Sequence, residues 1–306
     1  MPSDISHRIT PAQQGTALDR LLRELCPGKS WNEVRRLVKS GKVSVDGKTV
    51  LEPTLRLNAG AEVALRMSAP RPGRPGALDP GVIVYADTHL VVVRKPPGIS
   101  TVPYEEDETG TLDELVRVLL KRRTGPEGPL RIVHRLDKET SGLIMFARSL
   151  SAQRELKQQF RVHSVRRRYL ALAHGNVPGA THKSRLLRDR GDGVRGSTRH
   201  RELGREAITH VKVVERLSGA TYIECQLETG RTHQIRIHLS EAGHPLLGER
   251  LYVRGYPGPI IAAPRLMLHA RELGFRHPIT GQTLLFEEPL PEDMARMLEQ
   301  LRQQRR

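Results

Sequence analysis

A stretch of fourteen residues, SAPRPGRPGALDPG from Ser68 to Gly81, contains four prolines and three glycines. Proline lacks a backbone N–H and glycine weakens regular structure, so such a stretch is typical of a linker that interrupts helices and sheets. The chain of 306 residues is long enough for a main domain with a smaller companion. We therefore expect a small domain at 1–67, a linker at 68–81, a larger domain at 82–290, and an amphipathic helix with a basic tail at 291–306.

Charge is the second feature that limits what the chain does. Lysine and arginine number 50 against 34 acidic residues, so the formal net charge is +16 and the isoelectric point is near 10.5. An excess of this size favours a polyanionic partner, nucleic acid before an anionic membrane, although an arginine-rich proteome would give the same composition. Hydrophobic residues make up 37%, which is enough for a folded core.

Cysteine content and the N-terminus indicate the compartment. Cys26 and Cys225 are too few and too far apart for a zinc site or a disulfide framework. The N-terminal sequence MPSDISHRIT lacks the apolar core of a secretion signal. No apolar run approaches the roughly 18 residues that span a bilayer. We expect a cytoplasmic protein with no membrane partner, and a monomer.

Residues 1–67 predict two short helices followed by a hairpin. The segment TALDRLLRELC has leucines at helical spacing, with Thr16 and Asp19 placed like a capping box. The segment SWNEVRRLVKSG has Ser30 and Glu33 in the same arrangement, and KVSVDGKTV has the Asp-Gly pair of a tight hairpin. The result is a small α/β domain.

The phrase RRLVKSGKVSVDGK resembles the S-four-type RNA-binding domain, which is named after a ribosomal protein. The resemblance lies in the order of helix, helix and hairpin, with basic residues on and after the second helix. It implies RNA binding through Arg35, Arg36, Lys39 and Lys42. A solvated basic face is the alternative interpretation.

The larger domain reads as strands joined through hairpins, with helices outside them. Two hairpins are expected, at VIVYADTHLVVVRKPPG and AITHVKVVERLSGATYIECQLETG. Two further strands, RIVHRL and LIMFAR, flank the loop DKETSG, and helices are expected at SAQRELKQQF and HQIRIHLSEAG. This order predicts an α+β fold with a central, mostly antiparallel mixed sheet flanked by helices and loops. Between Lys183 and Arg205, eight basic residues against three acids predict a long mobile loop, either solvated or ordered by a phosphate backbone.

The phrase VHRLDKETSGLIMFAR places an aspartate among basic residues. His134 and Arg135 precede Asp137, and Lys138 follows it. Nearby positive charge favours the ionised carboxylate, which suits a nucleophile or an electrostatic stabiliser better than a proton-donating acid paired with Glu139. The sequence contains no glycine-rich phosphate loop, dinucleotide fingerprint, serine-hydrolase turn or metal-binding spacing. We therefore expect neither a cofactor nor a metal.

Five stretches within 82–291 resemble, in order, the motifs of the RluA-type pseudouridine synthases. They are RKPPGISTVP, HRLDKETSGLIMFARS, RRYLALAHG, TGRTHQIRIHLSEAGHPLLGE and LMLHARELGFRHPITG. Five motifs in a fixed order are a specific match. The chain departs from the family at Val102, near which a histidine is usual, and at Gly248-Glu249, where Gly-Asp is usual. We expect both departures to lie away from Asp137.

The resemblance implies that uridine is isomerised to pseudouridine: the glycosidic bond is broken, and the uracil is turned and rejoined through carbon without a cofactor. It implies that Asp137 is the catalytic residue, Arg236 its ion-pair partner, and Tyr169 the ring that stacks on the uracil and assists loss of the carbon-bound proton. It also implies that Arg135 helps fill the place left by the extruded nucleotide. The remaining residues of the implied RNA-binding pocket are Arg231, His233 and Gln234.

The RNA-binding domain and linker resemble those of the family's bacterial ribosomal-RNA members, which implies large-subunit ribosomal RNA as the substrate. Two alternatives are the same reaction on transfer RNA and a ribosome-assembly factor that binds RNA without catalysis. For Tyr169, His233 and Gln234, packing in the core is the alternative to a role in the pocket.

Overall fold

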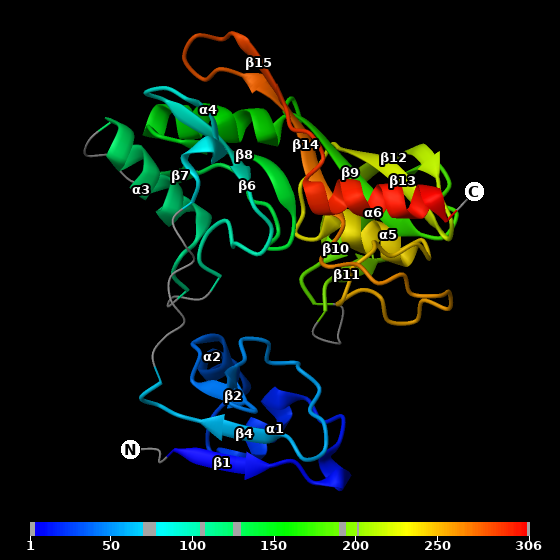
Figure 1. Cartoon of the computed structure of the whole chain (residues 1–306). Helices are drawn as coiled ribbons and strands as arrows, with labels where there is room; N and C mark the ends of the chain where they lie inside the picture. Colours follow the sequence, from blue (N-terminus) through cyan, green and yellow to red (C-terminus); the bar gives the residue numbers. More distant parts are fainter. Residues whose placement is uncertain are drawn as a thin grey trace. The chain divides into compact units, whose positions relative to one another are not determined.

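The computed structural model describes residues 4–69, 78–104, 108–124, 130–189, 194–200 and 202–304. The chain divides into two compact units, Met1–Gly76 and Ala77–Arg306 (Figure 1), and each has its own apolar core. The division falls inside the predicted linker at 68–81, of which residues 70–77 lie outside the described residues. The last two residues of the predicted basic tail also lie outside them.

In its described residues, the first unit packs two helices on a four-stranded antiparallel sheet with the strand order β1-β4-β2-β3. Its elements are β1 (Ile5–Arg8), a 3-10 helix (Pro11–Gln13), α1 (Leu18–Leu25), α2 (Trp31–Lys39), β2 (Val43–Val45), β3 (Lys48–Thr49) and β4 (Glu62–Leu65). Leucines and valines from both helices and from β2 and β4 form the core, as their spacing predicts.

Local signals set most of the boundaries in this unit. Ser30 and Glu33 form the predicted capping box at the start of α2, and the Asp46-Gly47 turn joins β2 to β3 with positive φ at both residues. The capping box predicted for α1 is wrong. The helix begins after Ala17 without a side-chain cap, because the carboxylate of Asp19 is buried and accepts a hydrogen bond from α2.

The described part of the second unit contains an eleven-stranded sheet, β11-β10-β12-β13-β9-β14-β8-β6-β5, with β15 paired to β14 and β7 to β8. The strands β8 and β14 run parallel, and the other neighbouring strands of this described sheet pair antiparallel. The predicted α+β fold with a mostly antiparallel mixed sheet is confirmed. Its elements, after a 3-10 helix at Pro80–Val82, are β5 (Ile83–Ala86), β6 (Leu90–Lys95), α3 (Leu112–Thr124), β7 (Arg131–Ile132), β8 (Ser141–Ala147), α4 (Leu150–Arg161), β9 (Arg166–His174), β10 (Ala180–Leu187), β11 (Gly196–Thr198), β12 (Arg205–Arg216), β13 (Ala220–Leu227), α5 (Gln234–Glu241), β14 (Leu268–Arg276), β15 (Thr283–Glu287) and α6 (Glu292–Gln303).

Side chains of this sheet alternate between its two faces, and each face has its own core. Tyr169 and Ile223 share a cluster with apolar residues of α3 and α5. Leu170 and Leu172, which point to the other face, pack against α6. A further cluster packs α4 on β6 and β8. Tyr169 therefore lies on the face of the sheet that α6 does not cover.

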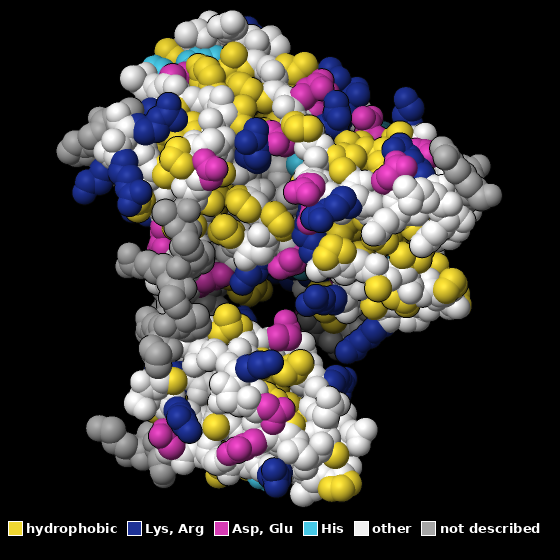
Figure 2. All heavy atoms as spheres, in the orientation of Figure 1, with side chains coloured by type: hydrophobic (Ala, Val, Ile, Leu, Met, Phe, Trp, Pro, Cys, Tyr) yellow, Lys and Arg dark blue, Asp and Glu magenta, His cyan; other side chains and the backbone are white. Residues whose placement is uncertain are grey.

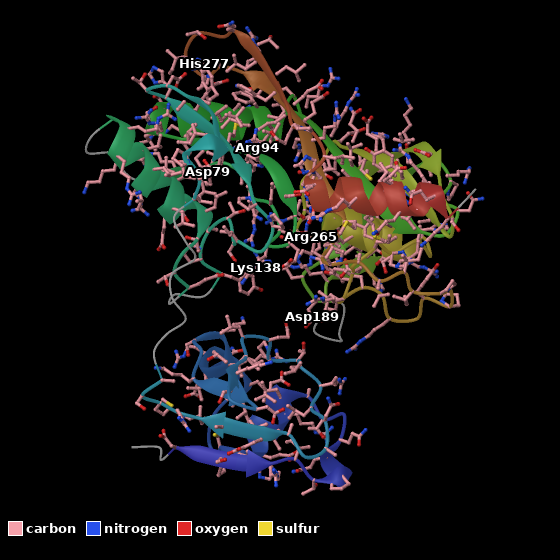
Figure 3. All side chains as sticks on the ribbon, in the orientation of Figure 1. Asp79, Arg94, Lys138, Asp189, Arg265 and His277 are labelled. Atoms are coloured by element: carbon pink, nitrogen blue, oxygen red, sulfur yellow. The ribbon has the colours of Figure 1, made fainter. Side chains whose placement is uncertain are left out.

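A histidine–aspartate pair fastens the β14–β15 hairpin to the turn between β5 and β6. His277, which directly follows β14 and is labelled in Figure 3, has its Nε2 2.8 Å from Oδ2 of Asp87. Asp87 also accepts hydrogen bonds from the Tyr85 hydroxyl and from the backbone N–H groups of His89 and Leu90. Burial alone would raise the pKa of Asp87, but these hydrogen bonds lower it to about 2.

Three features differ from the sequence-based expectations. The helix α3 was not predicted, and the strand expected at RIVHRL is reduced to the two residues of β7. The loop expected between Lys183 and Arg205 contains the end of β10 and the whole of β11, while residues 190–193 and 201 lie outside the described part. Over the described ranges, every helix is too short or too polar to cross a membrane.

Candidate active site

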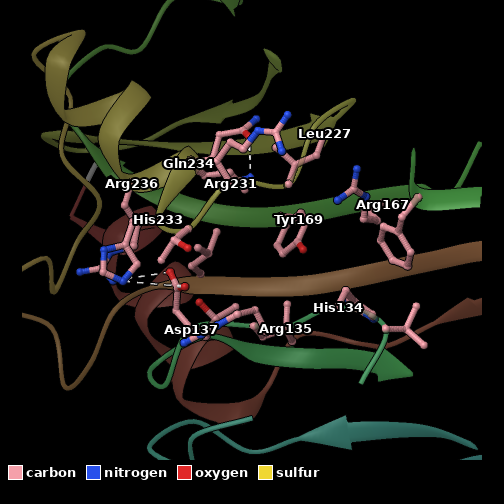
Figure 4. A pocket seen from close by; sticks show the side chains of 18 of the residues that line it. His134, Arg135, Asp137, Arg167, Tyr169, Leu227, Arg231, His233, Gln234 and Arg236 are labelled. Carbon is pink, nitrogen blue, oxygen red and sulfur yellow. Dashed lines mark hydrogen bonds and ion pairs between the residues drawn. The ribbon is translucent and has the colours of Figure 1, made fainter. Parts of the chain in front are cut away.

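A cavity of about 440 Å³ opens in the second unit beside β9. Three segments supply most of its lining: residues 133–137, which lead toward β8; the end of α4 with the start of β9; and residues 227–236, which run from the end of β13 into α5. In Figure 4, Asp137 and Arg236 lie on one side of Tyr169, and Arg167 lies on the other. Among the described residues that line the cavity, Asp137 is the one carboxylate.

The backbone around Asp137 is held by the last residue of β6 and by the segment that follows it. The hydroxyl of Thr101 accepts the N–H of Leu136 at 3.1 Å and donates to the Leu136 carbonyl at 2.8 Å. The fully buried Lys95 donates from Nζ to three backbone carbonyls at 2.7 to 2.9 Å, those of Pro96, Lys138 and Thr140. These bonds hold the loop on both sides of the aspartate.

Lys95 is fully buried. Burial lowers the pKa of Lys95 to about 7, while the nearby carboxylates of Glu139 and Asp137 act to raise it. Three carbonyl acceptors take three N–H bonds, which only the protonated ammonium supplies. Protonated Lys95 is therefore the form that holds the Asp137 loop.

The structure brings Asp137 and Arg236 together. Oδ2 of Asp137 lies 3.5 Å from Nη1 of Arg236, and the two side chains are only 16% and 13% exposed. On the other oxygen, Nε2 of His233 lies 3.9 Å from Oδ1 (dashed lines in Figure 4). Burial opposes the charge of Arg236, but the adjacent carboxylates of Glu249 and Asp137 raise the pKa of Arg236 above its usual value. The guanidinium therefore stays charged beside the aspartate.

Glu249 holds Arg236 from the side opposite Asp137. Its carboxylate accepts hydrogen bonds from Nε and Nη2 of Arg236 at 2.7 and 2.8 Å, and from the backbone N–H groups of residues 250–252. Gly248 makes this turn possible: its φ is +77°, and a Cβ there would lie 1.8 Å from the carbonyl oxygen of Arg265. Glu249 does not contact Asp137, but the fold returns it to the far side of Arg236, so this departure from the family lies next to the site.

His233 is strained and neutral. It precedes α5 with φ of 59°, a left-handed conformation, and its Nδ1 lies 2.7 Å from the hydroxyl of Tyr252. Burial lowers the pKa of His233 to about 4, against the opposing effect of Asp137. The Tyr252 ring also lies under Arg236, with 5.3 Å from the guanidinium carbon to the ring centroid. Tyr252 thus supports both residues that contact Asp137.

The other residues predicted for the pocket have different surroundings. Tyr169 lines the cavity but is only 8% exposed, and burial raises the pKa of its hydroxyl. Arg135 is exposed at the cavity wall. Gln234 is buried, and its amide is occupied: it accepts from the Thr229 hydroxyl and the Arg231 N–H, and donates to Ile208 and Thr209. Gln234 therefore packs the loop that carries Arg231 and His233.

In the first unit, three of the four predicted RNA-binding residues are exposed on α2, namely Arg35, Arg36 and Lys39. Arg35 donates to the buried carboxylate of Asp19 at 2.9 Å, and Lys42 is half-buried and donates to a backbone carbonyl. No aromatic residue of this unit was predicted to contact RNA, but Trp31 is 46% exposed at the start of α2, with Arg35 5.7 Å from its ring centroid.

The supporting residues of the site were also missed: Lys95, Thr101, Arg167, Glu249 and Tyr252. Their signals were present, because Lys95 and Thr101 belong to RKPPGISTVP, and Glu249 ends the stretch that contains Arg236. Among the described residues, no three or more His, Cys, Asp or Glu side chains gather as they would around a metal ion.

Comparison with known proteins identifies the two units. Residues 89–241 match the model of the RNA pseudouridylate synthase family, and residues 18–63 match the S4 domain. An uncharacterized RNA pseudouridine synthase of Bacillus subtilis, YlyB, is 38% identical over 95% of both chains. Ribosomal large subunit pseudouridine synthase D of Zymomonas mobilis is 35% identical over 96% of both chains.

A solved structure agrees with the fold. Human RNA pseudouridylate synthase domain containing 4 superposes with a TM-score of 0.60 at 25% identity, over 72% of this chain and 92% of that one. The family model spans the loop of Asp137, the strand of Tyr169 and the helix of Arg236. The chain therefore belongs to the RNA pseudouridylate synthase family, a family of isomerases, and carries an S4 domain ahead of its synthase unit.

Proposed function

We propose that the protein isomerises uridines of large-subunit ribosomal RNA to pseudouridine in the cytoplasm, with Asp137 as the catalytic residue. The observation that carries this proposal is the position of Asp137: its carboxylate lies 3.5 Å from Arg236 at the edge of a cavity that Tyr169 also lines. Relatives named ribosomal large subunit pseudouridine synthase D align over nearly the whole chain, which supports ribosomal RNA as the substrate.

The chemistry asks for a charged carboxylate that is held still. The bond between N1 of uracil and C1′ of ribose breaks, a bond between C5 and C1′ forms, C5 loses its proton and N1 gains one, so composition does not change. Asp137 either attacks the ribose or the base, or stabilises the charge that develops as the first bond opens. Both routes need the ionised carboxylate beside Arg236.

The remaining residues accommodate the base. An enzyme that acts on a base inside folded RNA must extrude it, and the cavity is within the size range of small-molecule sites. The Tyr169 ring stacks on the uracil, and its hydroxyl assists loss of the proton from C5. Arg135, exposed at the cavity wall, fills the gap that the extruded nucleotide leaves. Arg36 and Lys39 of the S4 domain contact phosphates elsewhere on the RNA.

The test has a cellular and a purified arm. Pseudouridines are mapped in ribosomal and transfer RNA from strains with and without the gene, and loss of one or more positions in large-subunit RNA is expected. Purified Asp137→Asn protein should retain RNA affinity and lose the activity by several orders of magnitude, on the scale on which enzymes lose rate when a nucleophile is removed. Loss of pseudouridine only from transfer RNA would reassign the substrate. Near-normal turnover by the Asn variant would remove Asp137 from the reaction.

A further inference from the structure

Three consecutive arginines begin β9 in different surroundings. Arg166 and Arg168 each form an ion pair with the buried carboxylate of Glu272, and Arg168 also lies 3.5 Å from Glu224. Arg167 lies between them and points to the opposite face of the strand, where it lines the cavity. Within the described residues, it forms no ion pair with a carboxylate.

Arg167 is nevertheless only 5% exposed. Its Nη2 donates to the carbonyl of Glu228 at 2.8 Å, its guanidinium carbon lies 5.1 Å from the centroid of the Phe160 ring, and its buried Nε has no hydrogen-bond partner. Gly230 leaves room for it, because a Cβ there would lie 2.5 Å from Nη1. Burying a guanidinium without a carboxylate is unfavourable, and burial accordingly lowers the pKa of Arg167. An anion in the cavity would relieve this.

Other basic side chains line the same cavity. Lys157 and Arg161 are exposed on the last turns of α4, and His163 and Arg231 are each held by a backbone carbonyl, of Glu228 and Glu206 respectively. Figure 2 shows Lys and Arg side chains interspersed with Asp and Glu on the face that it draws. The described residues that line the cavity, in contrast, include one carboxylate, that of Asp137, which lies beyond Tyr169 from Arg167 (Figure 4).

We propose that this end of the cavity, formed by Arg167, Arg231, Arg161 and Lys157, is a phosphate subsite that holds a phosphodiester of the RNA strand next to the extruded uridine. The inference rests on the proposed function. Arg167 and Tyr169 are two residues apart on one strand, about 7 Å along it, so the phosphate bound here is close to the base that Tyr169 contacts. The subsite fixes the strand while the uracil turns.

The subsite is tested by pairing protein variants with neutralised phosphates. The probe is an RNA hairpin from large-subunit ribosomal RNA that the wild-type protein converts, made with a methylphosphonate at each linkage around the target in turn. It is bound to the full-length Asp137→Asn protein with and without Arg167→Gln. Loss of one charged hydrogen bond should weaken binding about ten- to hundredfold and flatten the log–log salt slope by about 0.7. A methylphosphonate at one linkage should cause the same loss of affinity in the Asp137→Asn protein, and should cause no further loss in the protein that also carries Arg167→Gln.

Two further variants keep the test decisive if Arg167→Gln does not fold. Arg161→Gln changes an exposed residue and Arg231→Gln a half-buried one, and each should flatten the slope in the same way. The matched control is Arg296→Gln, which should leave the salt slope unchanged. Arg296 is exposed on α6, which packs against the other face of the sheet. Unchanged affinity and slope in Arg161→Gln and Arg231→Gln, or strictly additive effects of every methylphosphonate with Arg167→Gln, would overturn the subsite.

A second probe separates failure of the subsite from failure of the proposed function. Wild-type protein and the same variants are bound to an oligouridylate, which requires no knowledge of the modified position. If no ribosomal hairpin is converted but oligouridylate affinity still depends on Arg167 and Arg161, the subsite stands and the proposed function fails. If a hairpin is converted and neither probe detects the variants, the proposed function stands and the subsite fails.

Discussion

Glu249 accepts two hydrogen bonds from Arg236, at 2.7 and 2.8 Å, on the side of the guanidinium away from Asp137. The Glu249 side chain is fully buried, and its carboxylate also closes the turn at residues 250–252. Burial would raise the pKa of Glu249, but the hydrogen bonds and charge of Arg236 lower it. The position of the arginine next to Asp137 thus depends on a residue that does not contact the aspartate.

We predict that Glu249→Gln lowers kcat while leaving RNA affinity nearly unchanged. The amide keeps the shape but carries no charge and places an N–H group against the guanidinium, so Arg236 loses its fixed position. Removal of one partner from a buried ion pair typically costs 3–5 kcal/mol, so thermal stability should fall as well. Glu249→Asp keeps the charge on a shorter side chain and is the matched variant.

Single-turnover rates and melting temperatures of both Glu249 variants check this prediction. The Asp variant should recover a larger share of the rate than the Gln variant at equal stability. If the two variants have equal rates once stability is matched, Glu249 is a structural residue only.

Tyr169 should separate stacking from proton transfer. Tyr169→Phe keeps the ring, so it should retain RNA affinity and lose rate. Tyr169→Ala should lose both, because base stacking on an aromatic ring is worth about 1–3 kcal/mol. The alanine also leaves a void in a packed core cluster, at a stability cost of about 3–5 kcal/mol. Affinity and rate are measured separately at a temperature where both variants are folded; equal behaviour of Phe and Ala would assign Tyr169 to the core alone.

Acid should destabilise the synthase unit through its buried histidines. His238 is 3% exposed, and its ring nitrogens lie 2.9 Å from the hydroxyls of Thr209 and Ser184. Burial, with a smaller contribution from His182, lowers the pKa of His238 from 6.5 to about 4. Between these values the unfolded chain binds a proton that the folded protein does not, so stability is lost as the pH falls from 6.5 toward 4.

We predict that His238 alone accounts for about 2 kcal/mol of the stability lost between pH 7 and 5, from 1.36 kcal/mol per unit over about 1.5 units. Urea denaturation of His238→Gln at both pH values should show a correspondingly smaller difference. The same substitution at the exposed His200 is the control. An unchanged pH dependence in His238→Gln would show that this histidine is not buried in its neutral form.

Features of the fold that depend on residues close together in the sequence could be predicted, and features that depend on tertiary contacts could not. The cap of Ser30 and Glu33 and the turn at Asp46-Gly47 involve neighbouring residues, and both formed as predicted. The cap at Thr16 did not form, because Asp19 makes a tertiary hydrogen bond to Arg35 instead. The helix α3 could have been predicted, because its apolar residues have helical spacing: Leu112, Val116, Leu119 and Leu120.

The site shows the same limit more strongly. The family motifs indicated Asp137 and Arg236, but the residues next to Arg236 in the sequence do not indicate which side chain holds the arginine in place. Glu249 comes next to Arg236 through the pairing around β9 and β14. Leu246 forms a β-bridge with Ala173 of β9, and the backbone N–H of Met267, just before β14, donates to the carbonyl of Leu247. The role of Arg167 could not be predicted either, because the sequence does not distinguish three adjacent arginines. In the structure, side chains alternate along β9, so Arg166 and Arg168 pair with carboxylates on one face and Arg167 lies on the other.

The last prediction concerns the exposed residues of α2 in the S4 domain. Arg35, Arg36 and Lys39 are all exposed, and Arg35 also forms an ion pair with the buried Asp19. If α2 tracks phosphates, Arg36→Gln with Lys39→Gln should flatten the log–log salt slope by about 1.4–1.8, which is about 0.7–0.9 for each phosphate that is no longer neutralised. The apparent KM should rise and kcat should stay nearly constant. Arg20→Gln, on an exposed ion pair of α1, is the control.

Trp31 should give a different signature on the same helix. Its ring is 46% exposed, so Trp31→Ala should weaken RNA binding by about 1–3 kcal/mol if a base stacks on it, without changing the salt slope, because no charge is lost. Trp31 is the single tryptophan of the chain, so its fluorescence in the wild-type protein reports the contact directly. An unchanged salt slope in the Arg36/Lys39 variant, together with tryptophan emission that RNA does not alter, would mean that α2 presents only a solvated face and that RNA binds elsewhere on the chain.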